Sequence, residues 1–259
     1  TPTGKEQLSK PQGPHEESKL RCLEYAVTRG KGVCISSSVK QGVTLKTRMT
    51  LQEAREIVGN GSSPLSQTSK MPGKSFSIPA AECKTGSKLA KIKNTVCSKC
   101  YAMKGSYTWS TTKKAQYRRL DRLTHAKWVP AMAVLLKKQD WFRWHDAGDL
   151  QGVWHLDNIV QVCRLTPNTK HWLPTREYSV VSDWVQENGR FPDNLTVRLS
   201  TLKIDFPPPT ALAERTGCVT SGVSSDDTFN CPAKHQNNEC RDCRSCWDES
   251  VSNVNYNLH

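Results

Sequence analysis

FRWHDAGDLQGVWHLDNIVQVCRLTPNTKHWLPTREYSVVSDWVQENGRFPDNLTVRLS (residues 142–200) alternates between two kinds of segment, and this alternation determines the fold class. Short segments rich in aromatic and β-branched residues are typical of strands, and they occupy residues 142–146, 170–175 and 195–200. Between them, apolar residues recur at helical spacing, in residues 148–165 and 178–189. Strands and helices that alternate through short connections predict βα units, which build a parallel sheet within an α/β fold.

The sequence before this stretch predicts further elements. Thr50 and Glu53 have the spacing of a capping box, so we expect a helix over residues 51–58, which Gly59 ends. A short strand is expected over residues 74–80, leading to Cys83. Two more helices are predicted, over residues 112–124 and 128–138.

Composition divides the chain into five segments. Residues 1–20 contain three prolines and two glycines and are too polar to form a core, so they are expected to be a tail. Prolines and serines are also frequent in residues 206–230, which we expect to form a connector. The predicted segments are a polar tail (1–20), an N-terminal extension (21–70), a βα core with the first cysteine group (71–205), the connector (206–230) and a cysteine-rich C-terminal segment (231–259).

Charge and cysteine content are the two unusual features of the composition. The 259 residues include 37 Lys and Arg against 24 Asp and Glu, which gives a net charge of +13, and 11 cysteines. The longest apolar run, residues 129–136, is much shorter than the roughly 20 residues that span a bilayer. No secretory signal pattern opens the chain. We therefore expect a cytoplasmic protein with no membrane partner, whose thiols bind metal rather than form disulfides.

Four of the cysteines have no second cysteine at the spacing of a metal-ligand pair. They are Cys22, Cys34, Cys163 and Cys218. Cys163 falls on the apolar face of the helix predicted over residues 148–165, where a cysteine is usually a small buried hydrophobic residue. We expect all four to be structural.

The other seven cysteines form two groups, and each group predicts a metal site. In the first group, Cys83 precedes the C-x-x-C pair of Cys97 and Cys100, and such a pair can bind one metal centre from a single turn. In the second group, three cysteines follow one another at C-x-x-C spacing, and an upstream cysteine precedes a proline, as in bacterial ferredoxins. The second group consists of Cys231, Cys240, Cys243 and Cys246. The spacing favours one or two iron–sulfur clusters of the 4Fe–4S type, and structural zinc is the alternative.

Most of the positive charge lies between Lys84 and Lys127, where 12 Lys and Arg stand against Asp121 alone. Four aromatic residues are interleaved with these cations, namely Tyr101, Tyr107, Trp109 and Tyr117. Cations mixed with aromatic rings are typical of surfaces that bind single-stranded nucleic acid. The candidate binding residues are Lys113, Lys114, Arg118 and Arg119. A solvated helix face, or cations that compensate a negatively charged cluster, are the alternatives.

Polar side chains follow each of the three strands predicted in residues 142–200. Ligands of parallel sheets gather at the carboxyl ends of the strands, so we expect these side chains to line a cofactor pocket. The candidates are His145, Asp146, Gly148, Asp149, Thr175, Arg176, Glu177, Arg198 and Ser200. Two of them have simpler interpretations, His145 as a buried core histidine and Asp149 as the N-cap of the following helix.

Several motifs resemble those of one family, the phage "gene product 88" domain. They include MPGKSFSIPAAECKTG (71–86), VCSKCYAMKGSY (96–107), FRWHDAGDLQ (142–151) and CPAKHQ with CRDCRSCWD (231–248). The resemblance extends over residues 71–259 and implies a viral protein made in the cytoplasm of a bacterial host. It implies no particular activity.

A weaker similarity extends to radical S-adenosylmethionine enzymes. In those enzymes, three cysteines after the first strand of a partial barrel hold a 4Fe–4S cluster, and a glycine-acid motif after the second strand binds the cofactor. Here Cys83 also follows a strand, but it lies 14 residues before Cys97, and Tyr101 follows the last cysteine instead of preceding it. The similarity implies parallel βα units in a partial TIM-like barrel, with irregular N-terminal and cysteine-rich C-terminal extensions, and S-adenosylmethionine as a cofactor.

Two functions are consistent with these patterns. The first is an iron–sulfur protein with redox or radical chemistry, in which each cysteine group holds one cluster and an electron donor is a partner. In a variant of this arrangement, Cys97 and Cys100 share a single cluster with C-terminal cysteines. The second function is a non-enzymatic module, held together by metal, that binds nucleic acid or a host protein through its basic residues.

Overall fold

The computed structural model describes residues 49–258 of the chain. Cys22, Cys34, the predicted polar tail and most of the predicted N-terminal extension lie outside the described residues. The first element is helix α1 (Leu51–Gly59), and its predicted capping box is confirmed. Glu53 N donates to Thr50 Oγ1 at 3.1 Å, while Thr50 N donates to Glu53 Oε2 at 2.7 Å. Two orphan backbone donors at the start of the helix are thereby satisfied.

A seven-stranded sheet forms the centre of the fold, and its strands lie in the order in which they occur in the sequence. The strands are β1 (Ser66–Gln67), β2 (Lys74–Phe76), β3 (Trp141–Trp144), β4 (Lys170–Thr175), β5 (Leu195–Ser200), β6 (Val219–Ser224) and β7 (Asn253–Asn257). Only β1 is antiparallel to its neighbour, and all the other pairs are parallel. The predicted α/β class is therefore confirmed, and curvature of the sheet into a partial barrel stays a prediction.

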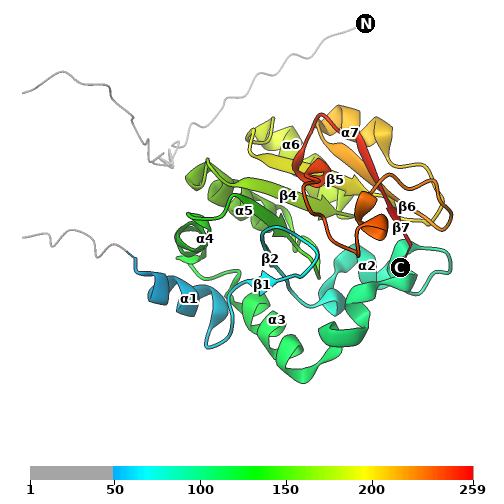
Figure 1. Ribbon diagram of the computed structural model, residues 1–259. Helices are drawn as coiled ribbons and strands as arrows, with labels where there is room; N and C mark the ends of the chain where they lie inside the picture. Colours follow the sequence, from blue (N-terminus) through cyan, green and yellow to red (C-terminus); the bar gives the residue numbers. More distant parts are fainter. Residues whose placement is uncertain (1–48, 259) are drawn as a thin grey trace, which may run out of the picture. The chain divides into compact units, whose positions relative to one another are not determined.

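Six helices connect the parallel strands, and the last four of them lie against one face of this sheet. The six are α2 (Lys84–Leu89), α3 (Ser110–Arg122), α4 (Trp128–Leu136), α5 (Val153–Leu165), α6 (Tyr178–Asn188) and α7 (Thr210–Thr216). Right-handed crossovers between strands in sequence order place the four helices that pack on the sheet on the same side. Accordingly, α4, α5, α6 and α7 follow one another along the sheet, and each contacts the next (Figure 1).

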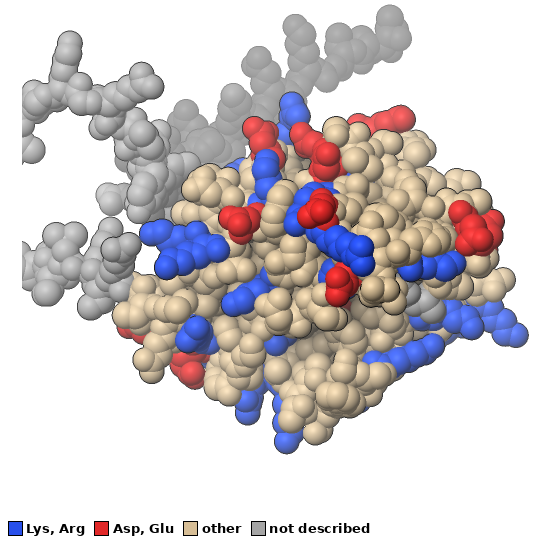
Figure 2. Space-filling model, in the orientation of Figure 1, with Lys and Arg blue, Asp and Glu red and all other residues tan. Residues whose placement is uncertain are grey.

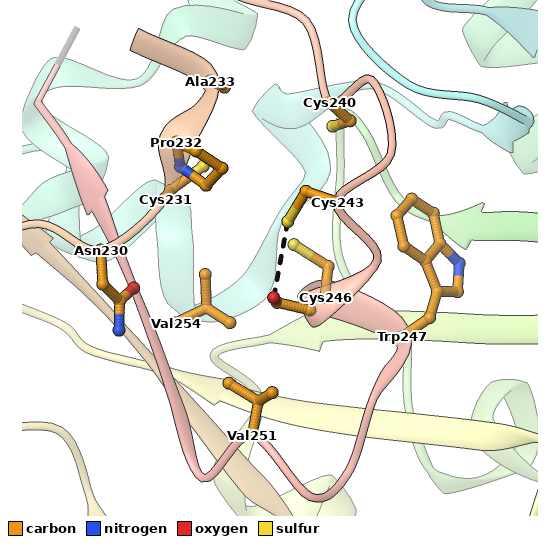
Figure 3. Close-up of a pocket in the computed structure, with 11 residues that line it drawn as sticks. Asn230, Cys231, Pro232, Ala233, Cys240, Cys243, Cys246, Trp247, Val251 and Val254 are labelled. Carbon is orange, nitrogen blue, oxygen red and sulfur yellow. Dashed lines mark hydrogen bonds between the residues drawn. The ribbon is translucent and has the colours of Figure 1, made fainter. Parts of the chain in front are cut away.

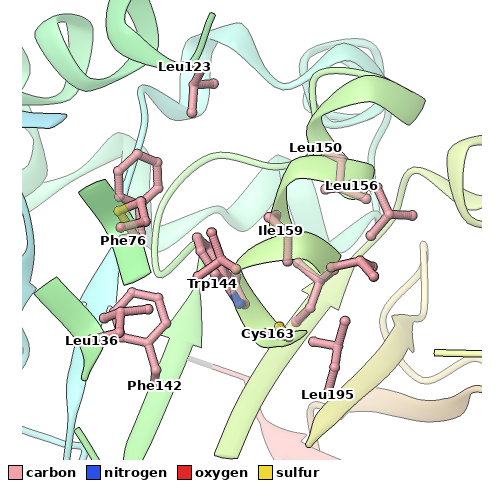
Figure 4. Close-up of a cluster of buried hydrophobic side chains, with 14 of the residues drawn as sticks. Phe76, Leu123, Leu136, Phe142, Trp144, Leu150, Leu156, Ile159, Cys163 and Leu195 are labelled. Carbon is pink, nitrogen blue, oxygen red and sulfur yellow. The ribbon is translucent and has the colours of Figure 1, made fainter. Parts of the chain in front are cut away.

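The main hydrophobic core lies between the sheet and these helices (Figure 4). Strand β3 shows how the sequence builds it, because successive side chains of a strand point to opposite faces. Phe142 and Trp144 are fully buried on the helical face, where their rings meet at 4.9 Å and pack against α5. Cys163 of α5 is buried in the same core, which confirms its predicted structural role.

The C-terminal segment covers the opposite face of the sheet. Its short helix η6 (Ser245–Trp247) contacts β4 and β5. Trp247 packs edge-on against Trp172 of β4 and Trp141 of β3, with ring centroids 5.2 and 5.7 Å apart. Met71 and Val254 complete this second, smaller core. The cysteine-rich C-terminal segment is therefore an integral layer of the fold.

The connector predicted for residues 206–230 is wrong. This segment contains α7 and β6, and β6 pairs with both β5 and β7. The prediction from composition failed because β6, VTSGVS, consists of small residues with few apolar side chains. It is nevertheless largely shielded from solvent. No helix within residues 49–258 has the length and apolar character needed to cross a membrane.

Candidate metal centre

The four cysteines of the second group line a single cavity of about 140 Å³ (Figure 3). Cys231 enters from one side, just before helix η5 (Pro232–His235). The other three come from the loop that runs into η6, and Val251 and Val254 form the apolar floor. The lining of one cavity therefore includes four thiols that span 16 residues of sequence.

Arg198 holds this loop in place from the strand beneath it. Its guanidinium, fully buried in β5, donates five hydrogen bonds of 2.5–3.1 Å, all to backbone carbonyls. The acceptors are the oxygens of Thr220, Ser245, Cys246, Asp248 and Val251. Burial lowers the pKa of Arg198. No carboxylate within residues 49–258 lies within ion-pair distance of its guanidinium. A planar group with five donors suits this task, which a single ammonium cannot perform.

Three further hydrogen bonds fix the same loop. Thr196 Oγ1 donates to the Trp247 carbonyl at 2.8 Å, and the Trp247 indole donates to the Phe142 carbonyl at 2.9 Å. At the other end, Cys240 N donates to the Lys70 carbonyl at 2.8 Å. Hydrogen bonds to the sheet therefore fix the backbone that carries the thiols of this group.

Cations surround the second group. Burial raises the pKa of Cys246 to about 11, while its hydrogen bond with Tyr256 Oη at 3.2 Å and the charge of Arg198 act in the opposite direction. Burial also raises the pKa of Cys240, which Lys70 and Arg143 counteract. A cavity with four thiols and nearby positive charge is an environment that favours thiolates once a metal binds.

The first cysteine group also comes together. Cys83 lies at the start of α2, and Cys97 lies in the short helix η2 (Val96–Lys99). The Sγ atoms of both cysteines lie within 3.6 Å of the point that a Cβ on Gly86 would occupy. The two thiols therefore face each other across a glycine that leaves space between them.

The electrostatics of the first group link it to the strand ends. Burial raises the pKa of Cys83, and Asp149, Cys100, Cys97 and Glu177 raise it further. Burial raises the pKa of Cys97 as well, which the nearby Arg176 guanidinium opposes. Cys83 and Cys97 therefore lie close to Asp149 and Glu177, which follow β3 and β4.

Asp149 joins the ends of these two strands. It is buried, and its carboxylate accepts hydrogen bonds from Thr175 Oγ1 at 2.6 Å, Arg176 N at 2.9 Å and Leu150 N at 2.8 Å. Burial raises its pKa to about 6 despite these bonds. The interpretation of Asp149 as a helix N-cap is wrong, because α5 begins after Gly152 without a side-chain cap.

Glu177 and Arg176 also make structural contacts. The buried Glu177 carboxylate accepts hydrogen bonds from Thr85 N and Thr85 Oγ1, both at 2.7 Å. Arg176 Nε donates to the Thr201 carbonyl at 3.0 Å. Of the residues predicted to line a pocket at this edge, Glu177 thus fixes the start of α2, and Asp149 and Arg176 fix the strand ends beside it.

Two of the remaining candidates keep a simple structural role. Gly148 has a φ of +88°, and a Cβ there would lie 2.2 Å from Ile78 Cγ1, so only glycine fits. His145 is buried with a φ of 57°, and its ring packs 5.2 Å from that of His155. Burial lowers the pKa of His145 well below its ordinary value, as expected for a neutral core histidine.

Asp146 lies in a polar network with Tyr107, Tyr101 and Arg143. Tyr107 Oη donates to Asp146 Oδ2 at 3.0 Å, and Tyr101 Oη donates to the Asp146 carbonyl at 2.5 Å. Arg143 donates to Tyr101 Oη at 3.0 Å and stacks 4.6 Å above the Trp172 ring. Arg143 therefore stands between the two cysteine groups, near Tyr101 on one side and Cys240 on the other.

Arg198 and Ser200 do not belong with the other strand-end candidates. Arg198 faces the C-terminal loop, as described above, and Ser200 Oγ accepts a hydrogen bond from Ser221 Oγ at 3.0 Å, within the sheet. The pocket predicted at three consecutive strand ends therefore does not include them. A side chain in a strand points to alternate faces, and the sequence did not show which face the C-terminal segment would cover.

The basic candidates divide into exposed and buried residues. Lys113, Lys114 and Arg118 are exposed on α3. The prediction for Arg119 is wrong, because its guanidinium is buried and donates to Ser63, Ser66 and Ser77. Arg119 lies three residues after Gln116 and four residues before Leu123, and both of these are buried. The three residues therefore share the inner face of α3.

Three contributors to the site were not identified from the sequence. Gly86 and Lys70 lie beside the cysteines and carried no signal. Arg143, in contrast, occupies the middle of an aromatic strand, where a lone charge already indicates a specific partner.

All cysteines within residues 49–258 are free thiols, and Cys218 lies half-buried outside both groups, against α7. Among the described residues, no three or more Cys, His, Asp or Glu side chains stand in an arrangement that would hold a single metal ion.

Comparisons with known proteins give one positive result. No match to the chain was found among curated proteins or among solved structures, and the similarity to radical S-adenosylmethionine enzymes gained no support. The family model described as "Gene product 88" matches residues 43–249. This match includes most of the sheet and every cysteine of both groups, and the chain belongs to the gene product 88 family.

Proposed function

We propose that this chain is an iron–sulfur protein in which each cysteine group binds one cluster. The observation that carries the proposal is the set of four thiols that line one cavity between the sheet and the C-terminal loop. Thiolates are the ordinary protein ligands of iron–sulfur clusters, and four of them complete the coordination of a 4Fe–4S cluster. The second group would therefore hold a cluster with no open position.

The surroundings of the second group fit such a cluster. Its walls are apolar at Val251, Val254 and Trp247, which limits access of water. Lys70, Arg143 and Arg198 supply positive charge close to the thiols. Charge and solvent exposure around the sulfurs set the reduction potential, so these cations would make the cluster easier to reduce.

The first group would bind a cluster of a different kind. Cys83, Cys97 and Cys100 provide three thiols, which leaves one iron of a 4Fe–4S cluster without a protein ligand. Such a cluster can bind a further molecule, and this arrangement supports redox or radical chemistry at the carboxyl ends of β3 and β4. Here Asp149 and Glu177 would position the loop, and Arg176 would favour the Cys97 thiolate.

Iron and acid-labile sulfide per chain, measured on anaerobically prepared protein, test the proposal. Two clusters give about eight iron atoms per chain, and one shared cluster gives about four. The protein is expected to be brown with broad visible absorbance. Colourless protein that contains zinc and no iron would contradict the proposal in favour of structural zinc.

Matched variants assign the iron to the two groups. Cys243→Ser should remove about half of the iron, because it removes one thiol from the four-thiol cavity. Cys218→Ser is the control, since this half-buried cysteine belongs to neither group. Equal iron in the wild type and in Cys243→Ser would exclude a cluster in the cavity.

The enzymatic form of the proposal has its own test. Reconstituted protein, supplied with dithionite as electron donor, is incubated with S-adenosylmethionine, and methionine and 5′-deoxyadenosine are quantified. Formation of both products that depends on Cys97 supports a radical enzyme. Protein that contains both clusters but forms neither product would be an electron-transfer or structural iron–sulfur protein.

A further inference from the structure

Helix α3 presents an exposed face on which aromatic rings alternate with cations. Lys113 and Tyr117 lie one turn apart on the same side of α3, and Trp109 is the N-cap residue one turn before Lys113. Trp109 is 64% exposed and Tyr117 is 47% exposed, although large aromatic side chains are ordinarily buried. Arg119 and Gln116 face the protein interior instead. The outer face of α3 is therefore unpartnered within the described residues.

The exposed tyrosines are held in fixed orientations. Tyr117 Oη donates to Glu82 Oε1 at 3.0 Å, and Tyr101, which is 43% exposed, donates to the Asp146 carbonyl. Each hydroxyl is thus tied down while the ring remains open to solvent. A ring that is already ordered loses little entropy when a flat ligand stacks on it.

The same contacts place this face beside the first cysteine group. Glu82, which anchors Tyr117, immediately precedes Cys83, and Tyr101 immediately follows Cys100. Tyr101 is therefore the neighbour in the chain of one clustered thiol, and the carboxylate that anchors Tyr117 is the neighbour of another.

The charge around the rings is mostly positive, with Glu82 against Tyr117 and Asp121 one turn further along α3 as the acidic residues. Nine lysines lie between residues 84 and 127, and all of them are exposed. Within residues 49–258, the only ion pair joins Lys234 to Asp227, far from this segment in the sequence. Figure 2 shows Lys and Arg gathered along the lower and right-hand edges of that view, where Figure 1 places α3 and α2. This face therefore attracts a polyanion.

We propose that this face of α3 binds single-stranded nucleic acid, with bases stacked on Trp109 and Tyr117 and phosphates near Lys113 and Lys114. Phosphates supply the negative charge, and only unpaired bases offer free faces to the rings. A duplex hides its base faces, and an acidic protein gains nothing from rings that are separated by lysines. The binding surface goes beyond the proposed function and does not require a bound cluster.

Fluorescence anisotropy of the full chain with a labelled oligonucleotide of roughly 20 nucleotides, which is longer than common single-strand site sizes, measures the binding. The double variant Trp109→Ala, Tyr117→Ala should weaken binding at least about tenfold, given the usual contribution of base stacking. Trp154→Ala is the matched control, because Trp154 is a 44% exposed tryptophan on α5. Its affinity should equal that of the wild type.

Salt dependence tests the lysines separately. Lys113→Gln, Lys114→Gln should lower the slope of log affinity against log salt by about 0.7 for each phosphate that these lysines neutralise in the wild type. The rings should not affect this slope. Iron content, measured on the same preparations, should stay at the wild-type value, so loss of nucleic-acid binding is distinguished from loss of a cluster.

Three results would overturn the proposal. The first is a wild-type affinity in the double variant that lacks both rings. The second is equally tight binding of a duplex of the same length, which would indicate attraction by charge alone. The third is displacement of the oligonucleotide by polyglutamate at equal charge concentration, which would favour an acidic protein partner.

Discussion

Glu177 and Thr85 are joined by two hydrogen bonds of 2.7 Å although 92 residues separate them in the sequence. Glu177 ends the connection from β4, and Thr85 lies in the first turn of α2, two residues after Cys83. Both donors of Thr85, the backbone amide and the hydroxyl, are satisfied by one buried carboxylate. This contact fixes the first cysteine group to the sheet, and negative charge suits the start of a helix.

Replacement of Glu177 by Ala should therefore release the first cysteine group. We expect the iron content to fall from about eight to about four atoms per chain, because the second group keeps its own support from Arg198. Iron analysis and circular dichroism of the anaerobic protein measure the effect. Glu187→Ala, an exposed glutamate on α6, is the control. Unchanged iron in Glu177→Ala would show that the first cysteine group does not depend on the Glu177–Thr85 contact.

Gly86 offers a smaller perturbation of the same group. A Cβ at this position would lie 2.9 Å from Cys83 Cβ and 3.5 Å from Cys97 Sγ, in the space between the two thiols. Alanine also favours helix more than glycine does, by roughly 1 kcal/mol, so α2 itself should not unfold. We expect Gly86→Ala to lose iron from the first group while its thermal stability without metal is retained. Ser87→Ala, one residue further along α2, should retain both, and equal iron in the two variants would contradict this role.

The order of strands and helices between residues 142 and 200 could be predicted from the sequence, because apolar periodicity there is strong. The strands of residues 170–175 and 195–200 coincide with β4 and β5. Strand β6 was missed because VTSGVS carries few apolar residues, and its burial comes from pairing with both neighbours and from the layer above it. Tertiary context, which the local sequence does not encode, decides such a strand.

The candidate site, like the fold, could be predicted only in part. The second cysteine group could be predicted because its ligands lie close together in the sequence. The supporting contacts could not, since Arg198 meets the cysteine loop across 48 residues of sequence, and Trp247 of that loop meets Phe142 across 105. The prediction placed Arg198 in a strand-end pocket, whereas its side chain points to the face that the C-terminal loop covers.

Arg198→Lys tests how much the hydrogen bonds from Arg198 to five backbone carbonyls contribute to stability. One ammonium cannot reach the five acceptors that the guanidinium satisfies, so several buried carbonyls would lose their donor. We expect the free energy of unfolding to fall by at least about 3 kcal/mol in urea titrations. Cys246, which is buried in the wild type, should also react faster with a thiol reagent. Arg190→Lys, at an exposed arginine after α6, is the control and should change neither quantity. A stability loss below about 1 kcal/mol in Arg198→Lys would contradict the stabilising role of these hydrogen bonds.

The buried His171 predicts a loss of stability in acid. Burial lowers its pKa from 6.5 to about 3, so between these values the unfolded chain binds a proton that the folded chain does not. Stability is therefore complete above pH 6.5 and falls as the pH decreases, by about 1.4 kcal/mol per pH unit for this group. His171→Phe, packed beside Phe142 and Trp144, should reduce the difference in unfolding free energy between pH 7.5 and pH 5 by about 2 kcal/mol. The exposed His235→Gln is the control, and an unchanged pH dependence in His171→Phe would show that His171 is charged in the folded protein.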